Sequence, residues 1–168
     1  MKIKDRNVLI TGGASGIGKI MGRNALEKGA RCLIIWDINE ANIAATIEEF
    51  APKGMVKGYR VDVGDIEAVR TVYETTVKEC GYIDLLINNA GIITSNRTFD
   101  EVDVSEIDRT MRINALAPMY VARVILPDML RRGVGHICNI TSAGGMLGNP
   151  RMAVYGASKW AAIGWSDS

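Results

Sequence analysis

The sequence has little with which to build several common kinds of site. His136 is the only histidine, and no cysteine or carboxylate pattern surrounds it. We therefore expect neither a metal site nor a Ser-His-Asp triad. The three cysteines, Cys32, Cys80 and Cys138, stand far apart and form no C-x-x-C pair. Their odd number and spacing favour reduced thiols in a reducing compartment, so a cytoplasmic location is expected.

Excess charge and long apolar runs are lacking as well. The formal net charge is +1, and Lys and Arg are scattered. Neither nucleic acid nor an acidic membrane is therefore expected as a partner. No apolar stretch approaches the roughly 20 residues that span a bilayer, and the first residues lack the apolar segment of a signal peptide. Without repeats or linkers, residues 1–168 are expected to form one domain.

What the sequence does contain is an alternation of short β-branched runs and longer helical ones. Strands are predicted at 7–11, 31–37, 56–63, 83–91 and 135–142. Helices are predicted after the Gly-rich turn through 28, after Asn39, over 65–80, over about 105–132 with interruptions at Pro118 and Pro127, and from 154. Such alternation predicts an α/β fold with right-handed crossovers, a doubly wound Rossmann-type parallel sheet of order 3-2-1-4-5. The more polar third strand suits an edge.

The stretch TGGASGIGKI (11–20) is compatible with two kinds of nucleotide loop. Residues 13–19 spell G-x-x-x-x-G-K, but a phosphate loop needs Ser or Thr next, to bind Mg²⁺, and Ile20 follows instead. A dinucleotide turn needs an acidic residue about 20 positions on, and Asp37 ends the second predicted strand. We therefore predict NAD, because Asp37 would repel the 2′-phosphate of NADP. Lys19 is then expected to face solvent. For the three glycines taken alone, the alternative is a tight strand-helix connection that binds no nucleotide.

Five motifs together resemble those of the short-chain dehydrogenase/reductase family, whose members are NAD(P)-dependent oxidoreductases of alcohols and carbonyls. They are T-G-x-x-x-G-x-G at 11–18, NNAG at 88–91, Asn114, Ser142 and YGASK at 155–159. The resemblance implies a set of cofactor-binding residues: Gly12, Ser15, Gly16, Ile17, Gly18, Asp37, Asp62, Val63, Asn89, Ala90, Gly91, Tyr155 and Lys159. For Asp62 the alternative is a cap on the following helix.

Tyr155 and Lys159 are four residues apart, which places them on one helix face. A nearby ammonium stabilises a phenolate, so the pair suits general acid-base work. Ser142, after the fifth strand, could hydrogen-bond a substrate oxygen. By resemblance, Asn114 perturbs its helix and helps to hold a water that links Lys159 to solvent. Each of these residues has a structural alternative. Tyr155 and Lys159 could lie at a surface, Ser142 could cap a helix or a turn, and Asn114 could be a surface asparagine.

The resemblance implies hydride transfer between NAD and a secondary alcohol or ketone. Segments 92–101 and 143–154 are expected to line the substrate pocket, and Met146, Leu147 and Met152 favour a lipophilic substrate such as a steroid, retinoid or fatty alcohol. Sugar and acyl substrates stay open. The family also pairs through the long helix and the Tyr-Lys helix, so a homodimer or homotetramer is expected.

The sequence ends within the helix that carries Tyr155 and Lys159. A full doubly wound sheet of this kind has six strands, and five are predicted here. We expect the final strands to be missing, with the chain either part of a longer enzyme or a fragment. A catalytically incomplete NAD-binding fragment or regulatory remnant is therefore the alternative function.

Overall fold

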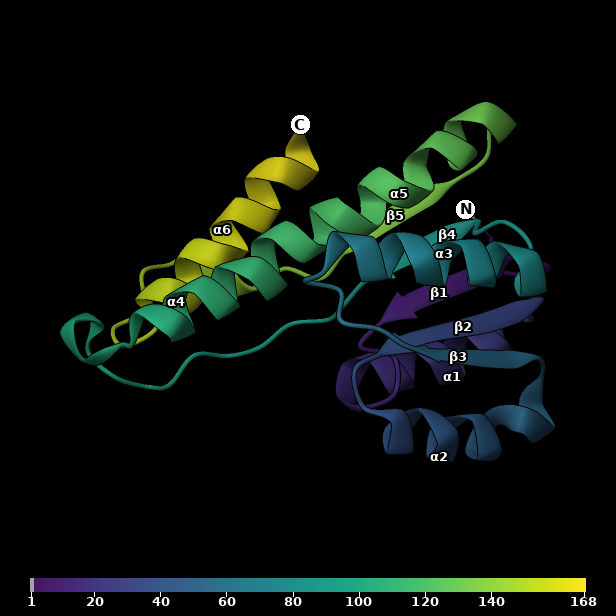
Figure 1. Cartoon of the computed structure of the whole chain (residues 1–168), viewed down its shortest axis with the longest axis horizontal. Helices are drawn as coiled ribbons and strands as arrows, with labels where there is room; N and C mark the ends of the chain where they lie inside the picture. Colours follow the sequence, from purple (N-terminus) through teal and green to yellow (C-terminus); the bar gives the residue numbers. More distant parts are fainter. Residues whose placement is uncertain (1) are drawn as a thin grey trace.

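Five parallel strands form one sheet in the computed structural model of the chain, which describes residues 2–168 (Figure 1). The strands are β1 (Asn7–Thr11), β2 (Cys32–Asp37), β3 (Val56–Arg60), β4 (Leu85–Asn88) and β5 (His136–Asn139). Their order is β3-β2-β1-β4-β5, with every neighbouring pair parallel. The predicted order and the edge position of the third strand are confirmed.

Helices cover both faces of this sheet. They are α1 (Gly16–Glu27), α2 (Glu40–Phe50), α3 (Ile66–Cys80), α4 (Val104–Met111), α5 (Ala117–Arg132) and α6 (Ala153–Asp167). α1 and α2 cover one face of the sheet, and α3 and α5 cover the other (Figure 1). Side chains alternate along a strand, so Leu33 and Ile35 pack into the core with α1 and α2, while Ile34 and Trp36 pack into the core with α3 and α5. Burial on both faces explains why β2 is almost wholly apolar.

Three strands are shorter than predicted. β3, β4 and β5 end at Arg60, Asn88 and Asn139, several residues before the predicted limits. The chain turns away from its neighbours there: the Asp62 carboxylate accepts a hydrogen bond from the Gly64 N–H at 2.8 Å. Polar residues that were expected to end strands therefore lie in loops at the carboxyl edge of the sheet.

Side chains cap two of the helices that leave this edge. Asn39 accepts from the Asn42 N–H at 3.0 Å and begins α2, as predicted. The cap of α3 is Asp65, which accepts from the N–H groups of Glu67 and Ala68 at 2.9 and 3.3 Å. The alternative of Asp62 as a helix cap is therefore wrong.

The long helical region is not broken at its prolines, which corrects the prediction. A π-helical segment, Arg112–Leu116, joins α4 to α5. Pro118 lies in the first turn of α5, directly after the π-helical segment, where the hydrogen-bond pattern of the helix changes. Pro127 lies on the exposed side of α5, where the carbonyl that it leaves unpaired can reach water.

The same run, Val104–Arg132, is long and apolar enough to cross a membrane by length and composition, with a mean hydropathy of 1.2 over its most apolar window. This differs from the expectation that no stretch approaches such a length. Ala117, Val121 and Ile125 from this run pack into the core below α3. A core helix has the same composition, so the run is weak evidence for a membrane span.

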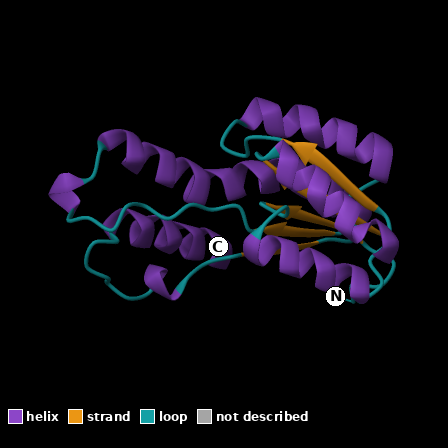
Figure 2. Cartoon of the chain, turned by 90° about the horizontal axis from the view of Figure 1, so that it is seen from below, coloured by secondary structure: helices purple, strands orange, loops and turns teal. Residues whose placement is uncertain are grey.

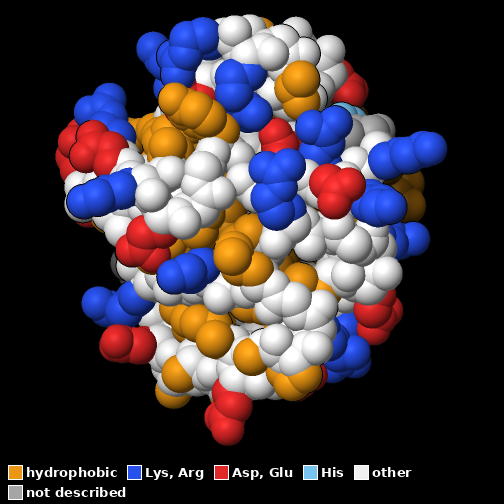
Figure 3. All heavy atoms as spheres, turned by 90° about the vertical axis from the view of Figure 1, so that its right-hand side faces the viewer, with side chains coloured by type: hydrophobic (Ala, Val, Ile, Leu, Met, Phe, Trp, Pro, Cys, Tyr) orange, Lys and Arg blue, Asp and Glu red, His pale blue; other side chains and the backbone are white. Residues whose placement is uncertain are grey.

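α4 and α6 lie side by side beyond the carboxyl ends of the strands (Figures 1 and 2). At the opposite end of the sheet, positive and negative side chains are interspersed, with no broad area of one sign on the face shown in Figure 3. The carboxyl edge is therefore where the polar loops and the extra helices gather. This is the edge at which open α/β sheets bind ligands.

Candidate cofactor and catalytic site

The turn between β1 and α1 depends on glycines at two positions. Gly12 has φ +62°, and a Cβ added to it would lie 3.0 Å from the Ala90 Cα. A Cβ on Gly18 would lie 2.2 Å from the Gly12 carbonyl oxygen. Any larger residue at these positions would push α1 away from the turn. The first turn of α1 thus packs directly on the end of β1.

A second turn, after β4, is tied to this one. The Thr11 hydroxyl accepts from the N–H groups of Asn89 and Ala90 at 3.0 and 3.1 Å. The Asn89 side-chain amide donates to the carbonyls of Thr11 and Gly12 at 3.0 and 3.1 Å. Asn89 was predicted to bind the cofactor, and its amide instead holds the two turns together while the residue still borders the cavity described below.

Asp37 lies beside the first turn, as the sequence predicted. Its carboxylate accepts from the N–H of Ala14 at 3.1 Å and from the N–H of Asn39 at 3.0 Å. Each oxygen keeps further lone pairs that can accept hydroxyl protons of a ribose. The carboxylate therefore has both a structural role and free acceptor capacity.

A cavity of about 730 Å³ opens along this edge. Of the thirteen residues predicted to hold the cofactor, ten line it: Gly12, Ser15, Gly16, Ile17, Asp37, Asp62, Val63, Asn89, Ala90 and Gly91. Gly18, Tyr155 and Lys159 do not line it. Gly18 lies behind the turn, and a Cβ on Gly91 would lie 3.5 Å from the Lys159 Nζ. One end of the cavity thus adjoins Lys159.

Seven more residues line the cavity without having been predicted: Trp36, Ile38, Val61, Ile92, Arg109, Arg112 and Ile113. Four of them directly follow or precede predicted residues, so the strand ends could have indicated them. Arg109 comes from α4, and Arg112 and Ile113 come from the π-helical segment, whose approach to Gly64 after β3 no local pattern indicates. The two arginines form no ion pair within residues 2–168.

Tyr155 and Lys159 lie on one side of α6. The Lys159 Nζ lies 5.9 Å from the centroid of the Tyr155 ring and donates to the Ile140 carbonyl at 2.9 Å. Lys159 is 6% exposed, and this burial lowers its pKa from the usual 10.5. A buried cation beside a phenol ring is the arrangement expected for the pair.

Ser142 lies three residues beyond β5 and caps a short turn, accepting from the Gly144 N–H at 3.1 Å. The alternative of a turn serine thus describes part of its role. A Cβ on Gly144 would lie 3.4 Å from both the Ser142 Oγ and the Tyr155 Cε1. Ser142 and Tyr155 therefore flank Gly144, although no hydrogen bond joins their side chains in the described chain.

Asn114 is buried in the π-helical segment, so the alternative of a surface asparagine is wrong. Its Oδ1 accepts from the Ile92 N–H at 2.8 Å, and its Nδ2 donates to the Ile92 carbonyl at 2.8 Å and to the Ser158 Oγ at 3.0 Å. Ser158 in turn donates to the Tyr155 carbonyl at 2.7 Å. Ser158, which the sequence reasoning passed over, thus links Asn114 to the helix of Tyr155.

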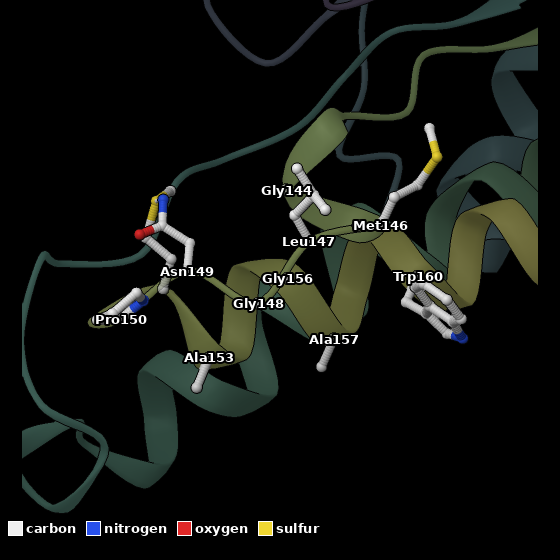
Figure 4. A pocket seen from close by; sticks show the side chains of 12 residues that line it. Gly144, Met146, Leu147, Gly148, Asn149, Pro150, Ala153, Gly156, Ala157 and Trp160 are labelled. Carbon is white, nitrogen blue, oxygen red and sulfur yellow. Dashed lines mark hydrogen bonds between the residues drawn. The ribbon is translucent and has the colours of Figure 1, made fainter.

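Figure 4 shows a separate apolar groove, of about 590 Å³, between the 144–152 loop and α6. Met146, Leu147 and Met152 line it, as do Ala157 and Trp160. Along α6, the lining residues recur at 153, 156, 157 and 160, a different face from that of Tyr155 and Lys159. The predicted apolar loop therefore borders this groove. Gly144, which lines the groove, also lies next to the Tyr155 ring, so the groove adjoins the Tyr-Lys corner, formed by Tyr155 and Lys159.

Lys19 does not simply face solvent, which corrects the expectation. Its Nζ lies 2.7 Å from Glu49 Oε2 and 5.8 Å from the centroid of the Phe50 ring. The lysine ties α1 to α2. It does not line the cavity, whose border at this turn is formed by Gly12, Ser15, Gly16 and Ile17.

The parallel sheet, the glycine turn and the cavity at the carboxyl edge define a dinucleotide-binding α/β protein. The family model for the short chain dehydrogenases matches residues 6–168, and the chain belongs to this family. It is 34% identical over 163 residues to a 2-dehydro-3-deoxy-L-rhamnonate dehydrogenase (NAD(+)) of Sphingomonas sp. (strain SKA58), covering 97% of this chain and 64% of that protein.

Human epidermal retinol dehydrogenase 2 is likewise 34% identical over 163 residues, covering 96% of this chain and 52% of that protein. Among solved structures, an NAD⁺-bound xylitol dehydrogenase superposes with a TM-score of 0.95 at 27% identity, covering 99% of this chain and 64% of the other. The chain thus spans between about half and two thirds of the length of these relatives.

Proposed function

We propose that the protein transfers a hydride between NAD and a secondary alcohol or ketone. The observation that carries this proposal is the cavity of about 730 Å³ along the carboxyl edge, which gathers ten predicted cofactor residues and ends beside Lys159. Its shape fits a dinucleotide: the free N–H groups at the start of α1 suit phosphates, and Asp37 suits ribose hydroxyls. When bound, NAD would supply the acceptor or donor of the hydride.

The chain's own groups would handle the proton. Tyr155 exchanges it with the substrate hydroxyl at its phenol oxygen, and Ser142 orients the substrate oxygen. The Lys159 Nζ lies 5.9 Å from the centroid of the Tyr155 ring, so its charge adjoins the phenol that exchanges the proton. Both Nδ2 protons of Asn114 are used, but its Oδ1 can accept one more hydrogen bond. We therefore place the proposed water on Oδ1, near the Lys159 Nζ.

NAD is proposed over NADP because of the Asp37 charge. A relative with NAD(+) in its name and the NAD⁺-bound xylitol dehydrogenase support this choice. A lipophilic substrate is supported by the apolar groove that meets the Tyr-Lys corner at Gly144, and by the retinol dehydrogenase relative. A sugar-acid dehydrogenase among the relatives keeps polar substrates as the rival. A homo-oligomer and a cytoplasmic location remain predictions.

The test is an NAD reduction assay on the protein with retinol-like, steroid and polar secondary alcohols. Tyr155→Phe should abolish turnover while NAD binding, measured by calorimetry, stays nearly intact. Retained turnover in this variant would contradict the assigned role. NAD binding by the unaltered chain with no turnover of any alcohol would instead support the incomplete-fragment alternative.

A further inference from the structure

The backbone of Ala14 is held from both sides by buried side chains. Its N–H donates to Asp37 Oδ2 at 3.1 Å, and its carbonyl accepts from the Thr46 hydroxyl at 3.1 Å. Ala14 is 3% exposed and Thr46 is fully buried. The peptide groups on either side of one residue are thus fixed by two residues from elsewhere in the chain.

Both holding residues belong to the unit formed by β2 and α2. Asp37 ends β2 and also accepts from the N–H of Asn39, which caps α2. Thr46 lies farther along α2, one or two turns from this cap. Because Asp37 fixes the start of α2, it also fixes where the Thr46 hydroxyl points. The two contacts on Ala14 therefore act as one clamp.

The Thr46 hydroxyl donates outside its own helix, to the Ala14 carbonyl. On α3, Thr71 and Thr75 each donate to the carbonyl four residues earlier in their own helix, at 3.0 and 3.3 Å. Thr46 could bond its own helix in the same way. Its hydroxyl instead crosses to the Gly-rich turn. Helix stability alone does not account for that contact.

Gly18 packs on the Gly12 carbonyl, but the two residues between Ala14 and Ile17 have little support of their own. Ser15 is the N-cap residue of α1, but its side chain makes no capping hydrogen bond. Gly16, with φ +50°, has no atom within 4 Å of where a Cβ would be. Both residues line the cavity. Their position therefore depends on Ala14, which precedes them and is held by Asp37 and Thr46, and on the packing of Gly18, which follows them.

We infer that Thr46 is a positioning residue which, together with Asp37, clamps Ala14 and thereby aims the N-terminus of α1 at the pyrophosphate of the cofactor. This inference rests on the proposed function only in naming the cofactor as the ligand. The clamp itself is a property of the chain without a ligand. Removing the Thr46 hydroxyl leaves the Ala14 carbonyl buried and unpaired, which favours movement of the turn.

The experiment compares Thr46→Val, which keeps the side-chain shape, with Thr46→Ser, which keeps the hydroxyl. In the ligand-free protein, Thr46→Val should speed hydrogen exchange of the amides at 14–18. Calorimetry should show roughly tenfold weaker binding of NAD, corresponding to one lost buried hydrogen bond. Adenosine, which has no phosphate, should bind within about twofold of its original affinity. Thr46→Ser should restore exchange and NAD affinity.

Thr71→Val is the matched control, because it removes a helix hydroxyl that contacts only its own helix. It should change neither measurement at the turn. Unchanged exchange at 14–18 in a folded Thr46→Val protein would overturn the inference, as would equal weakening of NAD and adenosine. If Thr46→Val does not fold, Thr46→Ala takes its place. Failure of the unaltered protein to bind NAD would overturn the proposed function, while the exchange data still decide the clamp.

Discussion

The side-chain amide of Asn114 pairs with both backbone polar groups of Ile92, accepting from its N–H and donating to its carbonyl, each at 2.8 Å. This pairing holds the loop after β4 against the π-helical segment. The third contact, to Ser158, reaches α6. One side chain therefore connects the loop after β4, the long helix and the helix of Tyr155.

Replacing Asn114 by Ala should destabilise the fold. Three hydrogen bonds are lost at a buried site, and the Ile92 backbone groups are left without partners. We expect a loss of about 2–3 kcal/mol in the free energy of unfolding, measured by urea denaturation. Asn24→Ala, at an exposed position on α1, should change it by less than about 0.5 kcal/mol. Equal effects of the two substitutions would contradict the assigned connection.

Gly18→Ala should disrupt the turn itself. The added Cβ would meet the Gly12 carbonyl oxygen at 2.2 Å and the Asn89 Nδ2 at 2.5 Å, so backbone must move. We expect a loss of stability of about 3 kcal/mol and a loss of NAD binding. Gly164→Ala is the control, since nothing lies within 4 Å of its Cβ position on α6. That variant should be as stable as the original or slightly more stable in thermal unfolding.

Asp37→Asn should shift the choice between NAD and NADP. Removing the carboxylate charge removes repulsion toward a 2′-phosphate, while the amide can no longer accept from both Ala14 and Asn39. NAD should bind more weakly and NADP more tightly, so that the ratio of their affinities falls at least about tenfold. Calorimetry with both cofactors measures it. An unchanged ratio would show that this carboxylate does not face the ribose.

Glu106 should make the loop around Ser95 sensitive to acid. Hydrogen bonds from the Ser95 N–H and hydroxyl hold the pKa of Glu106 below its usual 4.5. Because the folded pKa is lowered, these contacts stabilise the fold fully above the unfolded pKa and are lost as pH falls through the folded one. The Ser95 amide proton resonance should therefore titrate with a midpoint below 4.5.

Glu106→Gln is the control for that titration, since it keeps the shape of the side chain and removes its charge. The Ser95 resonance should then show no transition in the acid range. A transition that persists in this variant would assign the effect to another group. Glu101, which accepts from the Thr98 N–H at 3.3 Å in the same loop, is the carboxylate to replace next.

Local residue patterns were enough to predict much of the sheet and the turn. The apolar run of β2 predicts burial on both faces, and Asp37 at its end predicts an acidic group beside the first turn. Gly12 and Gly18 were identified by spacing alone, and their close contacts give the physical reason. The strand ends were predicted too far along, because β propensity does not show where a neighbouring strand stops offering hydrogen bonds.

The long helix shows why other expectations failed. Pro118 and Pro127 predict breaks from local rules, yet the π-helical segment and the exposed position of Pro127 let the helix continue. That Met146 and Leu147 line the substrate pocket stays a prediction; they border a groove that reaches Tyr155 only through Gly144. The face of α6 that borders a site depends on how α6 packs against the rest of the chain. The residue pattern of the loop at 143–154 does not predict that packing.

The sequence by itself determined the order of elements, the family motifs and the residue types at the carboxyl edge, because each follows from periodicity or from fixed spacing along the chain. Only the tertiary structure decided which of these residues meet. Thr46 and Ala14, Asn114 and Ser158, and Lys159 and Gly91 are between 32 and 68 residues apart in the chain. These residues meet because α2 packs against the sheet and α6 packs against the π-helical segment, and burial then makes each polar partner necessary.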